Sequence, residues 1–199
     1  MRIYEDKANK EGKHLIKNEW WQKNKIDVVR VPLPVGDYVL ENEKIADVIV
    51  RKAKRCVELK KMDFMGCYNI SVDSKQSIQE LIGDFQAEHE RFRDELLLAK
   101  NNGIRLYIVV ENEFQWISQK KNIFNEPIKE NKELFRWKNP RAFIFKKGKQ
   151  AYPNCAKGAW LAKCCITMEH KYGCKFVFCS PEDSARIITE ILEGRYAGG

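Results

Sequence analysis

Two acidic residues and one lysine form the pattern in this sequence with the clearest chemical meaning. Asp73 and Lys75 follow the apolar segment 70–72 and are separated by one residue, and Asp37 lies upstream, directly after Gly36. Because residues two apart in a strand project to the same face, Asp73 and Lys75 are expected to lie together. Two carboxylates from neighbouring strands can bind Mg²⁺, and a lysine beside them can orient water or stabilise a pentacovalent phosphate. The spacing therefore predicts metal-assisted hydrolysis of a phosphodiester.

A second acid–x–lysine pattern, Glu58 and Lys60, competes with the first. It lies in a basic stretch with little periodicity, and no helical pattern follows it. Asp73, by contrast, follows a predicted strand and precedes a predicted helix. The alternative interpretation of Asp73 itself is a helix N-cap, which its position also permits.

Apolar periodicity predicts the elements that position these residues. It predicts strands at 1–4, 26–33, 38–40, 44–50, 70–72, 104–110 and 175–179. It predicts helices around 15–21, over 78–99 with Gly103 after the end, over 158–170 and from Pro181 onward. This order is typical of an α/β fold with a mixed central sheet and helices on its faces. We expect one domain over 1–199, with a core at 1–112 and 156–194 and an irregular insertion at 113–155.

Composition narrows the class of protein. The chain of 199 residues has 36 Lys and Arg against 28 Asp and Glu, a net charge of +8 that favours a polyanionic partner such as nucleic acid. No stretch approaches the roughly 18 apolar residues of a membrane span, and the N-terminus lacks the apolar core of a signal peptide, so we expect a cytoplasmic protein with no membrane partner. The seven cysteines, an odd number, favour reduced thiols in the core, with a zinc site as the minority interpretation.

The GDY sequence at 36–38 and the VDSK sequence at 72–75, followed by the predicted helix from Ser77, resemble the XPF-type (structure-specific endonuclease) nuclease domain of the PD-(D/E)xK superfamily. That family carries GDY and then ERK leading into a helix. The resemblance spans residues 1 to about 111 and is closest to compact phage and bacterial members. The sequence departs from the family pattern at the first acid, which is Asp73, and at the middle position, which is Ser74.

The resemblance implies a restriction-endonuclease-like sheet with an inserted basic segment, and it implies roles for single residues. Asp37 and Asp73 match the metal ligands of the family, Lys75 matches its catalytic lysine, and Asp6 matches an aspartate that ends the first strand near the metal. The implied cofactor is Mg²⁺, with Mn²⁺ as a substitute. The implied substrate is DNA, in branched or flap form, and relatives pair through this domain, so a homodimer is possible.

Basic residues elsewhere offer candidates for nucleic-acid binding. Arg51, Lys52, Lys54 and Arg55 lie between the two motif segments, followed by Lys60 and Lys61. Arg91 and Arg93 lie on the predicted helix after Lys75. They are predicted to contact backbone phosphates, although a solvated charged surface is an equal alternative for each group. Aromatic and cationic residues also mix over 137–149, a composition that suits stacking on unpaired bases but equally suits an insertion packed around one tryptophan.

Three functions fit these patterns. A metal-dependent DNA endonuclease is favoured by the complete acid, acid and lysine set. The first alternative is a catalytically inactive DNA-binding module that keeps the fold, as some relatives do. The second is a restriction-type or RNA-directed nuclease on the same core.

Overall fold

The computed structural model describes residues 1–10, 12 and 14–197, and its centre is a six-stranded mixed sheet. The strand order is β10-β5-β4-β3-β1-β2. Strands β10, β5 and β4 run parallel, β3 runs antiparallel to both β4 and β1, and β1 pairs with β2 in parallel. The bounds are β1 Arg2–Asp6, β2 Asp27–Val31, β3 Tyr38–Leu40, β4 Ile70–Lys75, β5 Arg105–Glu111 and β10 Lys175–Cys179.

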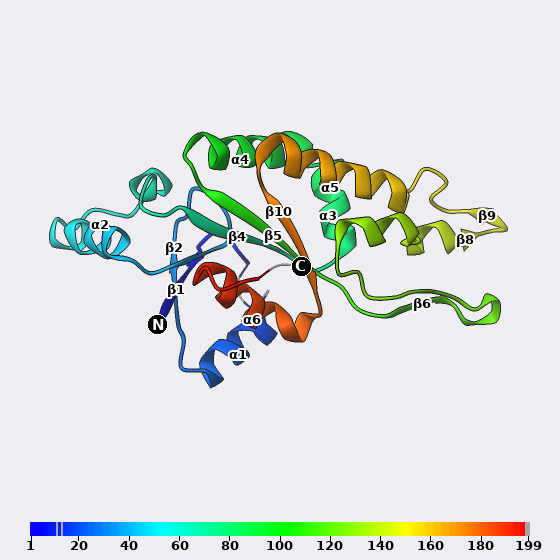
Figure 1. The fold of residues 1–199 in the computed structure, drawn as a ribbon, viewed down its shortest axis with the longest axis horizontal. Coiled ribbons are helices and arrows are strands. Elements are labelled where there is room, and N and C mark those ends of the chain that lie inside the picture. The colour runs from blue at the N-terminus through cyan, green and yellow to red at the C-terminus, as the bar shows by residue number, and fades with distance from the viewer. Residues whose placement is uncertain (11, 13, 198–199) are drawn as a thin grey trace.

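Helices cover both faces of this sheet (Figure 1). They are α1 (Leu15–Lys23), α2 (Glu43–Lys54), α3 (Ile78–Phe85), α4 (His89–Asn101), α5 (Gly158–Tyr172) and α6 (Pro181–Leu192). One apolar core joins α1 and α6 to the sheet through Trp21, Val72 and Ile188. The other joins α3, α4 and α5 to the opposite face, around Phe92 and Ile108. The arrangement is the predicted mixed sheet with helices on its faces.

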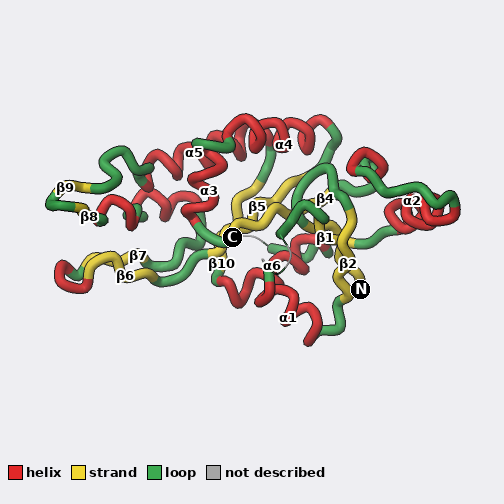
Figure 2. Tube along the Cα trace, turned by 180° about the vertical axis from the view of Figure 1, so that it is seen from behind, coloured by secondary structure: helices red, strands yellow, loops and turns green. Residues whose placement is uncertain are grey.

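The insertion at 113–155 lies outside the six-stranded sheet and forms two small ribbons that extend to one side (Figure 2). The first pairs β6 (Gln115–Ser118) with β7 (Ile123–Asn125), and the second pairs β8 (Phe145–Lys146) with β9 (Lys149–Gln150). Short 3-10 helices complete the segment: η2 (Gln119–Lys121), η3 (Asn131–Arg136) and η4 (Pro140–Phe143). A further one, η1 (Lys61–Phe64), precedes β4.

Two predicted elements were wrong. The segment 44–50 is not a strand but part of α2, although its β-branched residues suggested a strand. Asn42 caps the helix by accepting a hydrogen bond from the Ile45 amide at 3.0 Å. Ile45 and Val48, one helical turn apart, are buried, so the helical period outweighs β propensity here.

The predicted single helix over 78–99 is two helices separated by a break at 86–88. The amides of Gln86 and Glu88 both donate to the Gly83 carbonyl at 3.1 Å, which ends α3 in a tight turn. Gly103 follows α4 with φ +67°, as predicted. The break redirects α4 so that its first turns lie over the carboxyl end of β4.

Candidate active site

Strand β4 brings Asp73 and Lys75 to one face of the sheet, as their spacing predicts. Val72 points to the core under α1 and α6, so Asp73 and Lys75 point to the opposite face, toward α3 and α4. Both side chains are buried, at 4% and 5% exposure. The helix that follows is capped by Ser77, whose hydroxyl accepts a hydrogen bond from the Glu80 amide at 3.1 Å. Asp73 therefore lies within the strand and is not a helix N-cap.

A tight approach between Gly36 and β4 positions Asp37 beside these residues. Gly36 has φ +72°, and a Cβ at this position would lie 2.2 Å from Ser71 Oγ. Only glycine fits this turn without displacing β4. The Asp37 amide donates to the Val72 carbonyl at 2.7 Å, and Asp37 Oδ2 accepts a hydrogen bond from the Ser74 amide at 2.8 Å. The Asp37 carboxylate is thereby fixed next to the strand that carries Asp73.

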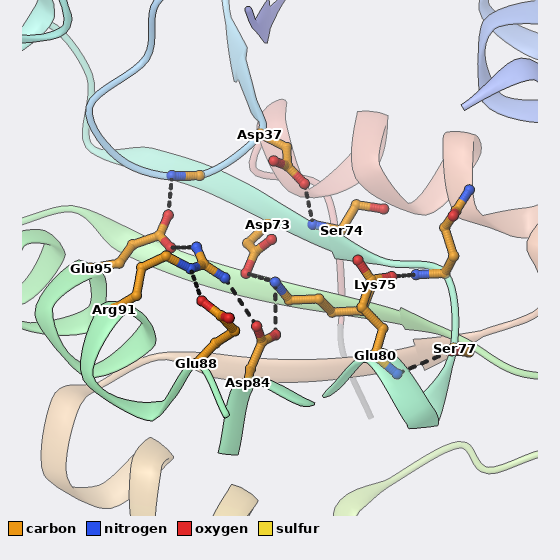
Figure 3. Close-up of polar contacts among 12 residues, drawn as sticks. Asp37, Asp73, Ser74, Lys75, Ser77, Glu80, Asp84, Glu88, Arg91 and Glu95 are labelled. Carbon is orange, nitrogen blue, oxygen red and sulfur yellow. Dashed lines mark hydrogen bonds and ion pairs between the residues drawn. The ribbon is translucent and has the colours of Figure 1, made fainter. Parts of the chain in front are cut away.

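Lys75 lies between two buried carboxylates (Figure 3). Its Nζ is 2.8 Å from Asp73 Oδ2 and 2.9 Å from Asp84 Oδ2. It also lies 5.7 Å from the centroid of the Phe92 ring. Burial alone lowers the pKa of Lys75, but the attraction of Asp73 and Asp84 is larger and raises it, so the ammonium stays charged.

Asp84, Arg91 and Glu95 extend this network, and of these Asp84 and Glu95 were not predicted from the sequence. Arg91 lies 3.1 Å from the second oxygen of Asp84, and Glu95 Oε1 accepts a hydrogen bond from the Gly36 amide at 2.8 Å. Arg91 and Glu95 are four residues apart on α4, which is helical spacing for one face. That spacing was the available signal. The break between α3 and α4 is what brings the three residues together.

Asp6 ends β1 and lies close to Asp37. Its amide donates to the Asp37 carbonyl at 2.8 Å. The Asp6 carboxylate accepts a hydrogen bond from the Leu33 amide at 3.0 Å and pairs with Lys61 Nζ at 3.0 Å. A cavity of about 550 Å³ opens over Asp6, Asp37, Asp73 and Lys75. Its lining also includes Lys61, Glu80, Asp84, Arg91 and Glu95.

Negative charge is concentrated in this cavity. Burial, and then the neighbouring charge of Asp73, raise the pKa of Asp37 well above its usual value. The same two causes raise the pKa of Glu95. Carboxylates that raise one another's pKa in a buried site form a cluster that a cation would stabilise. Across the residues the structure describes, however, no group of three or more His, Cys, Asp or Glu side chains is arranged to hold a metal ion.

The other predicted residues lie at different places. Arg51, Lys52, Lys54 and Arg55 are at the end of α2, where Lys52 pairs with Asp63 at 2.8 Å. Arg93 pairs with its neighbour Asp94 at 2.9 Å. Among the basic residues predicted for nucleic-acid binding, Lys61 and Arg91 line the cavity in the described part of the chain, whereas Arg51, Lys52, Lys54, Arg55 and Arg93 do not. The competing Glu58 is exposed and lies in the loop after α2.

The mixed sheet with helices on both faces, and with Asp37, Asp73 and Lys75 lining one cavity, is the arrangement that the resemblance to the XPF-type nuclease domain implies. The chain matches the model of the ERCC4 domain over residues 7–191, and it therefore belongs to the ERCC4 domain family. No curated protein matches the sequence.

Solved structures of XPF from Aeropyrum pernix have the same fold. One is similar with a TM-score of 0.51 and 12% identity, over 97% of this chain and 60% of that one. The other, XPF from the same organism in complex with DNA, gives a TM-score of 0.50 and 13% identity, over 96% of this chain and 63% of that one. This chain thus spans about three-fifths of the length of those two chains, and the likeness at such low identity concerns the fold.

Proposed function

We propose that the chain is a Mg²⁺-dependent DNA endonuclease that cuts branched or flap DNA. The observation that carries the proposal is the convergence of Asp37, from the turn before β3, with Asp73 and Lys75 of the adjacent strand β4 in one open cavity. Membership of the ERCC4 domain family supports nuclease chemistry. The DNA in one of the similar XPF structures supports the class of substrate.

The donor set suits Mg²⁺, or Mn²⁺ in its place. Mg²⁺ is commonly held by one or two carboxylates, with water and substrate phosphate at the other positions. Asp37 and Asp73 would supply the two carboxylates. Asp6 would join them as a third ligand if its pairing with Lys61 opened, since its backbone is already hydrogen-bonded to Asp37. The ion would polarise the phosphate and lower the pKa of bound water.

The chain's own residues would then orient the reaction. A water molecule adds to phosphorus and one P–O bond of the backbone breaks. One proton of the water passes to the departing oxygen, which leaves a phosphate monoester on one end and a hydroxyl on the other. The Lys75 ammonium, held between Asp73 and Asp84, would position the water or stabilise the charge that develops on phosphate. Asp84 acts through Lys75 and is a positioning residue.

We also propose which residues contact the DNA, the oligomeric state and the cellular location. The net charge of +8 supports a polyanionic substrate. Arg51, Lys52, Lys54, Arg55 and Arg93 remain candidates for phosphate contacts, and a homodimer and a cytoplasmic location remain proposals. No described helix has the length and apolar character needed to cross a membrane.

Calorimetric titration with Mn²⁺ and cleavage of a DNA panel test the proposal together. We expect Mn²⁺ binding that is lost in Asp73→Asn, and faster cutting of fork or flap DNA than of duplex DNA with the same sequence. Equal cutting of duplex and fork would refute the branched-DNA preference. Binding of DNA without any cutting, and without Mn²⁺ heat, would identify an inactive nuclease-fold DNA-binding module. Faster cutting of matched RNA would identify an RNA-directed nuclease.

A further inference from the structure

The insertion at 113–155 carries most of the chain's excess positive charge. It contains ten Lys and Arg against four Glu, which is six of the net charge of +8. The lysines gather at the tips of the two ribbons, with Lys120 and Lys121 on the first and Lys146, Lys147 and Lys149 on the second. Such a concentration is an electrostatic footprint for a polyanion.

The insertion also holds most of the exposed aromatic side chains. Six Phe, Trp and Tyr side chains are more than a third exposed in the described part of the chain, and five belong to the insertion. These five are Phe114, Trp116, Phe135, Phe145 and Tyr152. Trp137 is instead buried, at 7%, where its carbonyl approaches the start of α5. The predicted mixture of aromatics and cations at 137–149 therefore includes one tryptophan that packs the insertion onto the core.

Three aromatic rings cover one face of the β6–β7 ribbon. Phe114 and Trp116 are two residues apart and therefore project to the same face, and Trp116 is paired across the ribbon with Phe124. The ring centroids of the three pairs lie 5.3 to 5.4 Å apart. Phe114 and Trp116 are each 46% exposed, so this aromatic face is open to a ligand.

Hydrogen bonds fix the aromatic ribbon to the core. Asn125, at the end of β7, exchanges two hydrogen bonds of 2.8 Å with the backbone of Lys138. The Asn139 side chain is buried and accepts a hydrogen bond from Gln79 Nε2 of α3 at 2.8 Å. The ribbon is thus held in a defined position relative to α3, the helix that follows the candidate catalytic strand.

A groove of about 300 Å³ runs from the base of this ribbon to the start of α3. Its lining includes Phe114 and Arg141 from the insertion and Gln76, Ser77 and Gln79 from the core. Ser74, Lys75 and Glu80, which flank this core segment on either side, line the catalytic cavity. The short segment from 74 to 80 therefore lines the cavity with some of its residues and the groove with others.

We propose that the aromatic face of the β6–β7 ribbon and this groove bind the unpaired strand of a branched DNA whose junction lies over the catalytic cavity. The inference rests on the proposed function. Bases would stack on Trp116 and Phe114, and Arg141 with the tip lysines would contact phosphates. Exposed aromatics beside cations are the combination that recognises single strands, because every base offers a stacking face. A second copy of this chain fits less well, since it would bring another positively charged insertion to this segment, whereas DNA brings phosphates of the opposite charge.

Fluorescence anisotropy in EDTA tests the inference without requiring catalysis. The probes are labelled oligothymidylate, a flap DNA and a blunt duplex, at one salt concentration. We expect Trp116→Ala to weaken binding of the oligothymidylate and the flap about tenfold, and to leave duplex binding within about twofold. Trp116→Phe should retain most of the affinity. Trp160→Ala is the matched control, because Trp160 is 37% exposed but lies on α5.

Each outcome separates the inference from the proposed function. Unchanged binding in Trp116→Ala overturns the inference even if wild type cuts flap DNA. An equal loss for duplex and oligothymidylate also overturns it, because the ribbon would then contact the backbone only. A change of oligomeric state in sedimentation, with DNA binding unchanged, would assign the ribbon to contact between copies. A selective loss supports it even if no cutting is observed.

Discussion

Replacing Lys75 with methionine tests the electrostatics of the cavity. The substitution keeps the length of the side chain but removes the ammonium from between Asp73 and Asp84, which are each only 4% exposed. Breaking a buried ion pair from one side costs about 3–5 kcal/mol, because the remaining charge is left uncompensated. Arg91 still pairs with Asp84, so we expect the lower value, about 3 kcal/mol.

Urea unfolding at pH 7 in EDTA measures this loss. With a slope of about 2 kcal/mol per M, the midpoint should fall by about 1.5 M. Arg93→Ala is the control, because Arg93 pairs with Asp94 and both side chains are exposed, at 41% and 65%. Exposed pairs of this kind contribute about 0–1 kcal/mol. Equal midpoints for the two variants would contradict the assigned role of Lys75.

The loss should also depend on pH. Burial raises the pKa of Asp84, and Lys75 partly offsets that shift. Without Lys75 the pKa should rise further, and a carboxyl with a raised folded-state pKa loses stability as pH increases. The difference between wild type and Lys75→Met should therefore shrink as pH falls from 7 toward 5. A difference that grows over that range would refute the sign of this argument.

Three further substitutions test single contacts. Asp37→Asn should make the metal-free protein more stable at neutral pH, because the pKa of Asp37 is raised and its charge opposes folding there. This gain in stability should vanish below about pH 4, where Asp37 is protonated in the unfolded chain as well. Thermal unfolding at several pH values measures both effects. Gly36→Ala should lower the free energy of unfolding by more than the roughly 1–2 kcal/mol that a left-handed alanine costs, because its Cβ would lie 2.2 Å from Ser71 Oγ. The double variant with Ser71→Ala should recover part of this loss, as urea unfolding would show. Gly158→Ala would place a Cβ 2.3 Å from the Trp137 carbonyl, so its melting temperature should fall; an unchanged value would contradict the close packing of the insertion.

The sequence predicted most of the sheet because its strands are short apolar runs with clear ends. The segment 104–110 is almost continuously apolar and forms β5 at the centre of the parallel pairs. The segment 44–50 was assigned wrongly because its residues are β-branched, whereas the cap at Asn42 and the helical spacing decide its structure. For this segment, residue composition alone predicts a strand, whereas the N-cap predicts a helix.

The candidate site was predicted where it depends on local spacing and missed where it depends on a turn. Asp73 and Lys75 project together because alternation along a strand is fixed. Asp84 and Glu95 reach the same cavity only because the chain turns at 86–88, and no residue pattern in that segment indicated a break. The aromatic face of the β6–β7 ribbon was likewise missed, since its rings come from two strands that had no predicted register.

Cleavage of a labelled flap DNA in Mg²⁺ tests the central claim most directly. Wild type would be compared with Asp37→Asn and Asp73→Asn, which preserve side-chain size, and with Arg186→Ala, which removes an exposed charge on α6 across the sheet. We expect wild type and Arg186→Ala to cut the flap DNA, EDTA to stop this cutting, and both Asn variants to lose it. Cutting that persists in EDTA, or in Asp73→Asn, would contradict the claim.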